Sequence, residues 1–183
     1  MKETQYGKIV SQEISDVVGN LDQQQLSVLV EAMLAAERVF VCGSGRSLLM
    51  MRAFAMRLMH IGVEAYVVGE TITPAIANGD LLIAGSGSGQ TRGTLATVQA
   101  AAARGAQTAV ITAHGNSQMA EACDLVVVVP LPVTGEAGPS SRQPLGSLFE
   151  QSLLVVGDVL VLSLMKQMGT TNEQMRARHT NLE

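Results

Sequence analysis

The segment LLIAGSGSGQT, residues 81–91, decides the fold of this chain. An unbroken apolar run from Leu81 to Ala84, followed by turn-forming Gly and Ser, is typical of a buried β-strand that ends in a tight loop. An Ala-rich stretch with helical spacing comes next, at residues 94–103. A strand, a glycine loop and a helix in this order form the repeating unit of α/β proteins, so the segment predicts that class.

The same order of strand, loop and helix recurs along the chain. RVFVCGSGRS, residues 38–47, predicts a strand at 38–42, a Gly-Ser-Gly turn and a helix at 46–60. Apolar periodicity and a Pro/Gly/Ser-rich loop at 130–144 predict the other elements: helices at 9–21, 26–34, 145–168 and 172–178, and strands at 63–68, 107–112 and 125–129. We expect a single flavodoxin-like, doubly wound α/β domain over residues 1–183, with a five-stranded parallel sheet flanked by helices.

The composition indicates which kinds of partner the chain is expected to bind. The charged share of 15% is below the usual value of about 25%, which indicates that some surface is buried between subunits of a homo-oligomer. A net charge of −4 and the absence of Trp argue against nucleic acid as a ligand. The polar start MKETQYGK lacks the apolar core of an export signal, and the apolar stretch 153–165 falls short of the roughly 20 residues of a membrane span. We therefore expect no membrane association and a cytoplasmic location.

The two cysteines do not predict a metal site. Cys42 and Cys123 lie in or beside apolar strands and lack the CxxC spacing of metal ligands. Both are expected to be buried thiols, and neither a metal nor a cofactor is expected.

The candidate ligand site consists of two loops at strand ends, the first at residues 43–47 and the second at residues 85–91. Each leads into a helix, whose first N–H groups and partial positive charge favour an anion such as phosphate. Glycine lets the backbone approach a ligand, and Ser and Thr hydroxyls donate further hydrogen bonds. The alternative is that these residues only form tight turns and helix N-caps. The candidate phosphate-binding residues are Gly45, Arg46, Ser47, Ser86, Gly87, Ser88 and Thr91.

Two other glycine-rich sites are disfavoured. The first loop places Leu48 where a dinucleotide fingerprint needs a small residue. The second loop lacks the Gly-Lys-Ser/Thr ending of a nucleotide-triphosphate loop. Binding of NAD and hydrolysis of nucleotides are therefore not expected.

At these loops the chain resembles the sugar isomerase (SIS) domain family, in which a Ser-rich loop holds a sugar phosphate. FAMRLMHIG at 54–62, VGETITPAI at 68–76, GSGSGQT at 85–91, PLGSLFEQ at 144–151 and the terminal RHTNLE make it most similar to the 6-phospho-3-hexuloisomerases of that family. The resemblance implies interconversion of D-arabino-hex-3-ulose 6-phosphate and D-fructose 6-phosphate, without metal or redox cofactor. It further implies a homotetramer and a place in the ribulose monophosphate pathway of formaldehyde fixation. The final Leu-Glu pair is also a common vector remnant.

The implied reaction needs an acid and a base. Transfer of the carbonyl between C3 and C2 passes through a 2,3-enediol, so a base moves the carbon-bound proton and an acid serves the two oxygens. Glu150, at the start of a long apolar helix after the ligand-side loop, is the candidate base, although it could merely complement the helix dipole. His179 is the candidate acid, and Arg46 could contact phosphate or a developing enediolate.

Other polar residues have structural explanations. We expect His60 to interact with the last carbonyls of its helix. Glu70 and Thr73 follow a strand and so lie on the ligand edge, but turn and capping roles explain them equally well. His114, in a His-Gly-Asn turn after a strand, is expected to be structural.

The length of the last helices predicts that the catalytic residues come from different subunits. The helix at 145–168 carries the chain roughly 30 Å from Glu150, and the tail before His179 recovers about 20 Å at most. His179 is therefore expected to act in the site of a neighbouring subunit. Two rival functions use the same loops: an aldose–ketose isomerase of the arabinose 5-phosphate type, and a sugar-phosphate sensor without catalysis.

Overall fold

The five strands form one parallel sheet. A computed structural model describes residues 3–132 and 141–182, so part of the predicted loop at 130–144 lies outside the described residues. The strands are β1 (Val39–Gly43), β2 (Ala65–Val67), β3 (Leu81–Gly85), β4 (Gln107–Thr112) and β5 (Leu125–Val128). Their order is β2-β1-β3-β4-β5, and every neighbouring pair is parallel. This is the flavodoxin-like order, so the predicted fold class is confirmed.

Seven helices accompany the sheet in the described residues. They are α1 (Glu3–Gly19), α2 (Gln23–Ala35), α3 (Gly45–Ile61), α4 (Arg92–Ala102), α5 (Gln118–Ala122), α6 (Ser147–Met168) and α7 (Asn172–Arg178). The sequence predicted all of them except α5. The first helix begins earlier than predicted, because its polar first turns carry no apolar periodicity.

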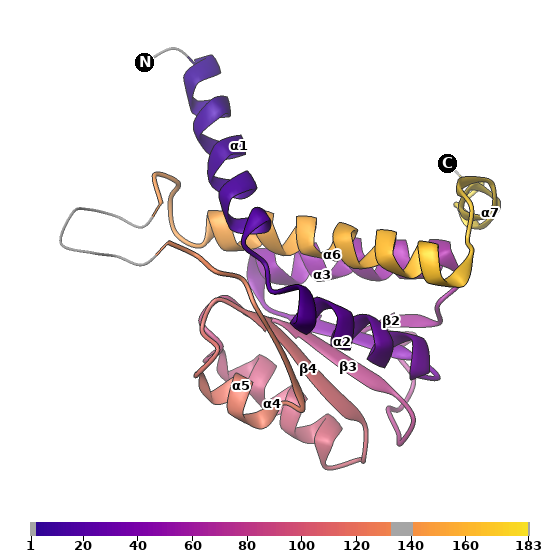
Figure 1. The fold of residues 1–183 in the computed structure, drawn as a ribbon. Coiled ribbons are helices and arrows are strands. Elements are labelled where there is room, and N and C mark those ends of the chain that lie inside the picture. Colours follow the sequence, from indigo (N-terminus) through magenta and orange to yellow (C-terminus); the bar gives the residue numbers. More distant parts are fainter. Residues whose placement is uncertain (1–2, 133–140, 183) are drawn as a thin grey trace.

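Helices lie on both faces of the sheet (Figure 1), and alternating side chains of the strands build a core on each face. In β1, Val39 and Val41 pack in the core that includes residues of α2, α3 and α6. Phe40 and Cys42 point to the opposite face, where α4 and α5 supply the partners. Because both faces are covered, β1, β3 and β5 are almost entirely apolar in sequence, and β4 has the apolar centre Ala109–Ile111 between threonines.

Helix α6 is the central helix of its layer. It is the one helix in the described ranges that is long and apolar enough to cross a membrane, and half of its most apolar window is buried inside the chain. It lies beside α3 (Figure 1), and a Cβ added at Gly157 would come within 3.1 Å of the Phe54 ring. This close packing on α3 is the packing of a core helix, as expected from the sequence.

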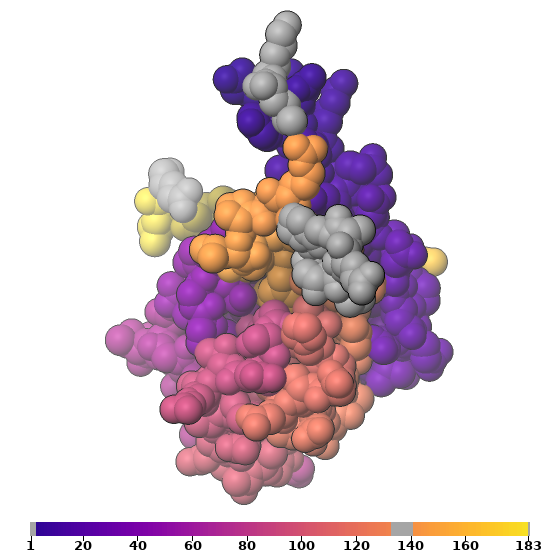
Figure 2. All heavy atoms as spheres, turned by 90° about the vertical axis from the view of Figure 1, so that its left-hand side faces the viewer, coloured from indigo at the N-terminus to yellow at the C-terminus, as the bar shows by residue number. Residues whose placement is uncertain are grey.

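Large apolar side chains are exposed on the outer faces of α3 and α6, and one is exposed on α1. The first turns of α1 extend away from the rest of the molecule (Figure 2), and Tyr6 there is 54% exposed. Leu49 and Met56 of α3 are exposed, as are Leu154 and Leu162 of α6. Exposed apolar side chains that gather on neighbouring helices are typical of a protein–protein contact.

The amino edge of the sheet is held by a partly buried ion pair. Arg38, just before β1, donates from Nε and Nη2 to the two carboxylate oxygens of Asp80, at 2.8 and 2.6 Å. The amide of Ala77 donates to the same carboxylate at 2.7 Å. Asp80 precedes β3 and is only 2% exposed. The pair fixes β1 against β3 at the edge opposite the two glycine loops.

Candidate functional site

The two glycine loops lie side by side at the carboxyl edge of the sheet. Gly43 at the end of β1 is the register partner of Gly85 at the end of β3. The loops are also joined by side chains, because Ser44 Oγ lies 3.0 Å from Thr94 Oγ1 in the first turn of α4. Ligands of open α/β sheets bind at this edge. The structure therefore brings together the two loops that the sequence singled out.

The second loop is packed from above by the start of α6. A Cβ at Gly87 would lie 3.0 Å from the ring of Phe149. At Gly85 it would lie 2.8 Å from Met51 and 3.0 Å from Leu153. The loop needs glycine at both positions because α3 and α6 approach its backbone this closely. This packing fixes the first turn of α6 over the loop.

The hydroxyls of the second loop differ in exposure. Ser86 is buried, and its Oγ lies 3.4 Å from Thr91 Oγ1. Ser88 is exposed, and its Oγ accepts a hydrogen bond from the Gln90 amide at 3.2 Å. The structure thus pairs Ser86 with Thr91 and leaves Ser88 at the open side of the loop.

Neither loop uses its side chains to cap a helix. Ser44 occupies the N-cap position of α3, and Thr91 occupies that of α4, yet neither side chain makes a cap hydrogen bond. By contrast, Asp22 at the start of α2 accepts hydrogen bonds from two amides of its first turn. If these loops served only to cap helices, Ser44 and Thr91 should accept such hydrogen bonds, and they do not. The first amides of α3 and α4 therefore make no hydrogen bond to these two side chains.

A charged cluster joins the first turns of α3 and α6. Helix α3 begins at Gly45, whose φ of 56° lies in the left-handed region, and Ser47 follows in the same turn. Arg46 Nη1 lies 3.1 Å from Glu150 Oε2 and donates to Ser147 Oγ at 3.1 Å. The predicted base is therefore in direct contact with the predicted arginine.

Glu150 keeps an unused acceptor inside the protein. Its Oε2 is buried and has no hydrogen bond among the described residues, although Arg46 lies within ion-pair distance. Gln151 Oε1 and Ser152 Oγ are in the same condition. Buried polar atoms without a partner are uncommon and often belong to reactive sites. A carboxylate with a free lone pair, beside an arginine and above two helix N-termini, is equipped to accept a proton from a bound anion.

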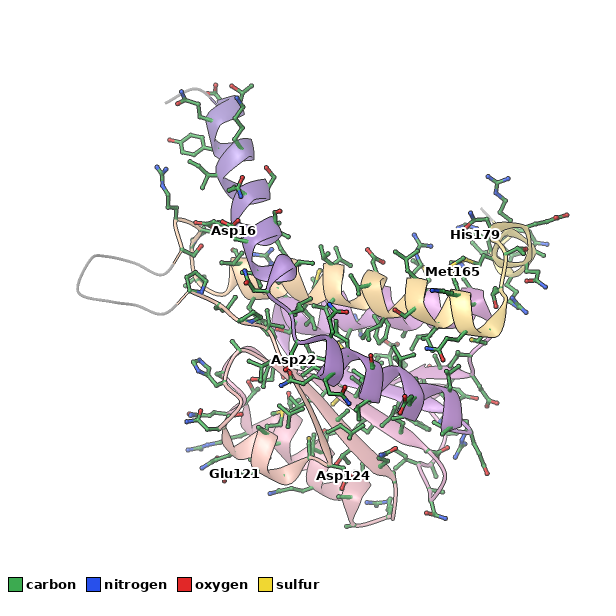
Figure 3. The ribbon with its side chains drawn as sticks, in the orientation of Figure 1. Asp16, Asp22, Glu121, Asp124, Met165 and His179 are labelled. Carbon is green, nitrogen blue, oxygen red and sulfur yellow. The ribbon has the colours of Figure 1, made fainter. Side chains whose placement is uncertain are left out.

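His179 lies away from this cluster. Figure 3 shows it beyond the end of α6, near Met165, and both residues line one cavity. Its imidazole stacks on that of His60, with ring centroids 5.1 Å apart and an interplanar angle of 12°. Arg46 and His60 are separated by almost the whole of α3, about 21 Å at 1.5 Å per residue. Within one chain, His179 and Glu150 are therefore at opposite ends of α3, as the lengths of the helices predicted.

The predicted capping role of His60 is wrong. The last carbonyls of α3, those of Leu58 and Met59, accept hydrogen bonds from the Gly62 amide instead. The imidazole of His60 is buried, and its Nδ1 lies 3.3 Å from Arg57 Nη1. The packing of α7 against α3 buries this ring, and the sequence of α3 alone does not reveal that packing.

The other polar candidates make structural contacts, although the side chain of Glu70 forms an ion pair and not a turn or cap hydrogen bond. Glu70 forms an ion pair with Arg52 at 2.6 Å, and Thr73 Oγ1 donates to the Val67 carbonyl at 2.6 Å. His114 is exposed, and its carbonyl accepts from the Ser117 amide.

The thiols are free and desolvated. Burial is the main cause that raises the pKa of Cys42 to about 12. It also raises the pKa of Cys123 to about 11, although Cys123 is only partly buried. The prediction of a buried thiol is confirmed for Cys42.

Four residues of the cluster were not identified from the sequence as site residues. They are Ser44, Thr94, Ser147 and Phe149, which link the two loops to each other and to α6. Three of them lie within segments that the sequence analysis had singled out: Ser44 in the first loop, and Ser147 and Phe149 in PLGSLFEQ. Their pairwise contacts depend on the crossing of α3, α4 and α6, which no local pattern encodes.

Known proteins are similar to this chain over the segments that form the candidate site. The sequence matches the SIS domain family over residues 32–154, which include both loops and Glu150. A 3-hexulose-6-phosphate isomerase from Bacillus subtilis is 37% identical over 185 residues, with 100% of both chains covered. One from Mycobacterium gastri is 42% identical over 176 residues, which cover 96% of this chain and 88% of the relative. A solved hypothetical protein from Methanococcus jannaschii, whose structure was used to infer the function of a 3-hexulose-6-phosphate isomerase, has a TM-score of 0.85 and 32% identity, with 98% of this chain and 99% of that chain covered.

Proposed function

The chain belongs to the SIS domain family, and we propose that it interconverts D-arabino-hex-3-ulose 6-phosphate and D-fructose 6-phosphate. Relatives of 37% and 42% identity over nearly the full length carry the name of this isomerase. The observation in the structure that supports the reaction best is the buried Oε2 of Glu150, which lies 3.1 Å from Arg46 Nη1 of the first loop and has no hydrogen bond among the described residues. An isomerisation through an enediol needs a base of this kind, and a sugar-phosphate sensor does not.

The phosphate binds in the two loops. The amides at the starts of α3 and α4 and the hydroxyls of Ser47, Ser86, Ser88 and Thr91 supply the donors. Gly45 leaves the backbone open, and Gly87 lets Phe149 of α6 pack on the second loop. Clamping the phosphate orients the sugar and supplies no chemistry itself. The reacting carbons must then lie toward the first turn of α6.

Glu150 transfers the carbon-bound proton. Starting from the 3-ketose, its carboxylate removes the proton from C2 and the electron pair forms the 2,3-enediol. Glu150, whose bound proton exchanges with solvent while the enediol is present, then returns a proton at C3. Arg46, which already contacts Glu150, is placed to stabilise negative charge on an oxygen of the enediolate. A second group must move the proton between the oxygens on C2 and C3, and His179 is the candidate because imidazole both donates and accepts near neutral pH.

The active protein is a homo-oligomer in which His179 serves a neighbouring subunit. Two findings support this assembly: His179 lies about one helix length from Glu150 of its own chain, and apolar side chains are exposed on α1, α3 and α6. A symmetric tetramer with reciprocal exchange of tails would complete every site. Residues 1–183 act as one domain in it, since α1 and α7, which lie outside the family match, pack on α6 and α3. A cytoplasmic location and a role in formaldehyde fixation complete the proposal.

The Glu150→Gln variant tests the function. The amide preserves the shape of the side chain but does not accept a carbon-bound proton, so we expect turnover to fall at least 100-fold and fructose 6-phosphate to bind nearly as before. Glu121→Gln is the matched control, because Glu121 is exposed on α5, on the other side of the sheet, and should retain full activity. Turnover of Glu150→Gln within about tenfold of the wild type would exclude Glu150 as the base.

Mixed oligomers test the shared site. Chains carrying Glu150→Gln and chains carrying His179→Ala should each be inactive. When the two are refolded together, sites that combine an intact Glu150 with an intact His179 should restore part of the activity. A mixture that co-assembles and stays inactive would place His179 outside the partner's site.

A further inference from the structure

The C-terminal helix α7 is fastened to the end of α3. Thr170 Oγ1 donates to the Ile61 carbonyl at 3.4 Å, and Arg178 Nη1 donates to the His60 carbonyl at 3.1 Å. The Arg178 guanidinium also lies against Gly62, where a Cβ would come within 3.0 Å of Nη2. Gly62 has a φ of 96°, a backbone conformation that favours glycine. These contacts give the tail a defined position even though no side chain of α7 is fully buried.

The His60 ring lies directly behind the His179 ring. His60 is 3% exposed, and the two rings are nearly parallel at a centroid distance of 5.1 Å. This separation is within the usual range of offset stacked rings. The His179 residue itself is exposed. The stack therefore restricts the plane of the exposed ring without covering it.

Arg57 determines which nitrogen of the His60 ring carries the proton. A guanidinium only donates hydrogen bonds, so at 3.3 Å from Arg57 Nη1 the Nδ1 atom of His60 must be the acceptor. The proton of the neutral ring then lies on Nε2. Burial lowers the pKa of His60 below its ordinary value, and the charges of Arg57 and His179 add to this effect. A neutral His60 ring places no positive charge against the stacked imidazole of His179.

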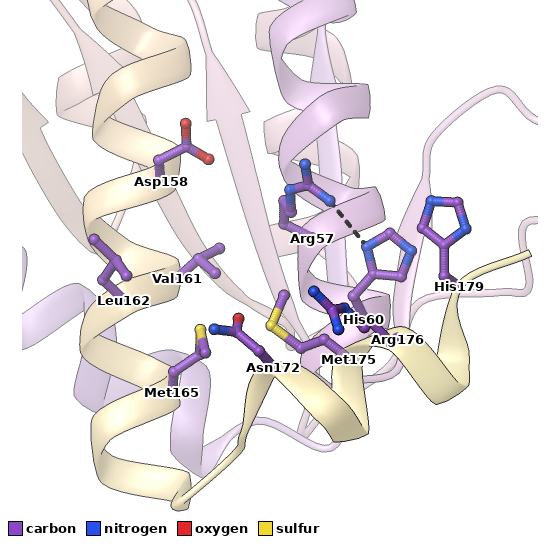
Figure 4. A pocket seen from close by; sticks show the side chains of 10 residues that line it. All are labelled: Arg57, His60, Asp158, Val161, Leu162, Met165, Asn172, Met175, Arg176 and His179. Carbon is purple, nitrogen blue, oxygen red and sulfur yellow. Dashed lines mark hydrogen bonds between the residues drawn. The ribbon is translucent and has the colours of Figure 1, made fainter.

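The histidine pair faces a cavity between three helices (Figure 4). The cavity has a volume of about 520 Å³ and is lined from α3, α6 and α7. Its charged lining consists of Arg57, Asp158 and Arg176, and its floor contains Val161 and Met165. The cavity is separate from the loops of the same chain, so His179 is presented to a molecule that approaches these helices from outside.

We propose that His60 is a positioning residue for His179: its buried ring fixes the plane and the location of the exposed imidazole, and Arg57 fixes the orientation of His60. This inference rests on the catalytic role given to His179 under the proposed function. The Glu150 site of one chain and the stacked pair of its partner would then form two rigid halves of one active site. His60 itself does not touch the substrate.

Two substitutions of His60 distinguish the role of the flat ring from the role of its nitrogen atoms. His60→Leu removes the stacking face, and we expect kcat to fall by about 10- to 100-fold with KM within about twofold, since small displacements of a catalytic group have effects of this size. His60→Phe keeps a stacking face and should retain kcat within about threefold of the wild type. Gln99→Leu, a substitution of an exposed residue of α4 on the other face of the sheet, is the control and should leave the kinetics unchanged.

A double variant shows whether His60 acts through His179. In a His179→Ala background, His60→Leu should cause no further loss of residual activity. The NMR signals of the His179 ring should move when His60 becomes Leu, because a stacked ring shifts its neighbour's resonances, and should move little when it becomes Phe. Unfolding curves of each variant verify that the tail region and the rest of the chain remain folded.

The outcomes separate the inference from the function on which it rests. Equal losses in His60→Leu and His60→Phe, a rise in KM alone, an unchanged His179 signal, or a further loss in the His179→Ala background would each overturn the positioning role while the isomerase stands. An active His179→Ala variant would remove the role of His179 and this inference together. A wild-type protein without turnover would instead refute the proposed function.

Discussion

The Gly43→Ala variant tests whether the two loops need bare backbone where they meet. A Cβ on Gly43 would lie 3.0 Å from the Gly85 carbonyl oxygen, 3.2 Å from the Leu48 amide nitrogen and 3.3 Å from the Leu48 Cα. All three are backbone atoms of β3 and α3, so none of them moves aside by a side-chain rotation. The strand end or the first turn of α3 must shift instead.

The cost of this shift follows from the packing. Overpacking of a tightly packed site by one methyl group costs about 1–3 kcal/mol, and the smaller entropy of the unfolded alanine chain offsets about 0.4–1 kcal/mol. We expect a net loss of about 1–2 kcal/mol. For a chain of this size the melting temperature falls by about 2–4 °C per kcal/mol, so a decrease of about 2–8 °C is expected. Because Gly85 directly precedes Ser86, the affinity for fructose 6-phosphate should fall as well.

Thermal and urea unfolding of Gly43→Ala, together with calorimetric titration of fructose 6-phosphate, measure both effects. Gly93→Ala is the matched control, because Gly93 lies exposed in α4 with no atom within 4 Å of an added Cβ. The control should be as stable as the wild type or more stable by about 0.5 kcal/mol, as expected for alanine in a helix. If Gly43→Ala proves as stable as Gly93→Ala, the close approach of the two loops is not a constraint.

Two further predictions concern the phosphate loop and the amino edge of the sheet. Ser86→Ala and Ser88→Ala should each weaken the binding of fructose 6-phosphate by about 1–3 kcal/mol in calorimetry, and unchanged affinity in both would remove these serines from the site. Asp80→Asn should destabilise the fold most near neutral pH and progressively less in acid: burial raises the pKa of Asp80, but hydrogen bonds from Arg38 and Ala77 outweigh it and the net pKa is lowered. A lowered pKa means that the stabilisation is complete above the ordinary value of about 4 and is lost as the pH falls through the folded value, so urea unfolding between pH 3 and 7 that shows a constant difference from the wild type would contradict the ion pair's role.

The fold could be predicted from the sequence because each strand is covered on both faces. Such strands are continuous apolar runs, and the glycine and serine residues that end β1 and β3 mark where the chain turns. Helix α5 could not be predicted, since Gln118–Ala122 is too short to show a helical period. Its start depends on Ser117, whose side chain accepts from the Ala120 amide.

The candidate site was predictable in part for the same reason. Glu150 and the loops occupy positions that the ends of strands and the starts of helices determine. The surroundings of His60 were not predictable, because they depend on Arg178 and His179, which are more than 100 residues away in the sequence. A helix that packs end-on against another leaves no periodic signal in either one.

The central claim is that the chain moves a carbonyl between C2 and C3 of a hexulose 6-phosphate. Incubating fructose 6-phosphate with the purified protein in D₂O and recording NMR spectra tests it most directly, because the exchanged hydrogen identifies the carbon from which the base takes a proton. The account predicts solvent deuterium at C3 together with a 3-ketose product. Deuterium at C1 would instead indicate an aldose–ketose isomerase, and binding without any exchange would indicate a sugar-phosphate sensor.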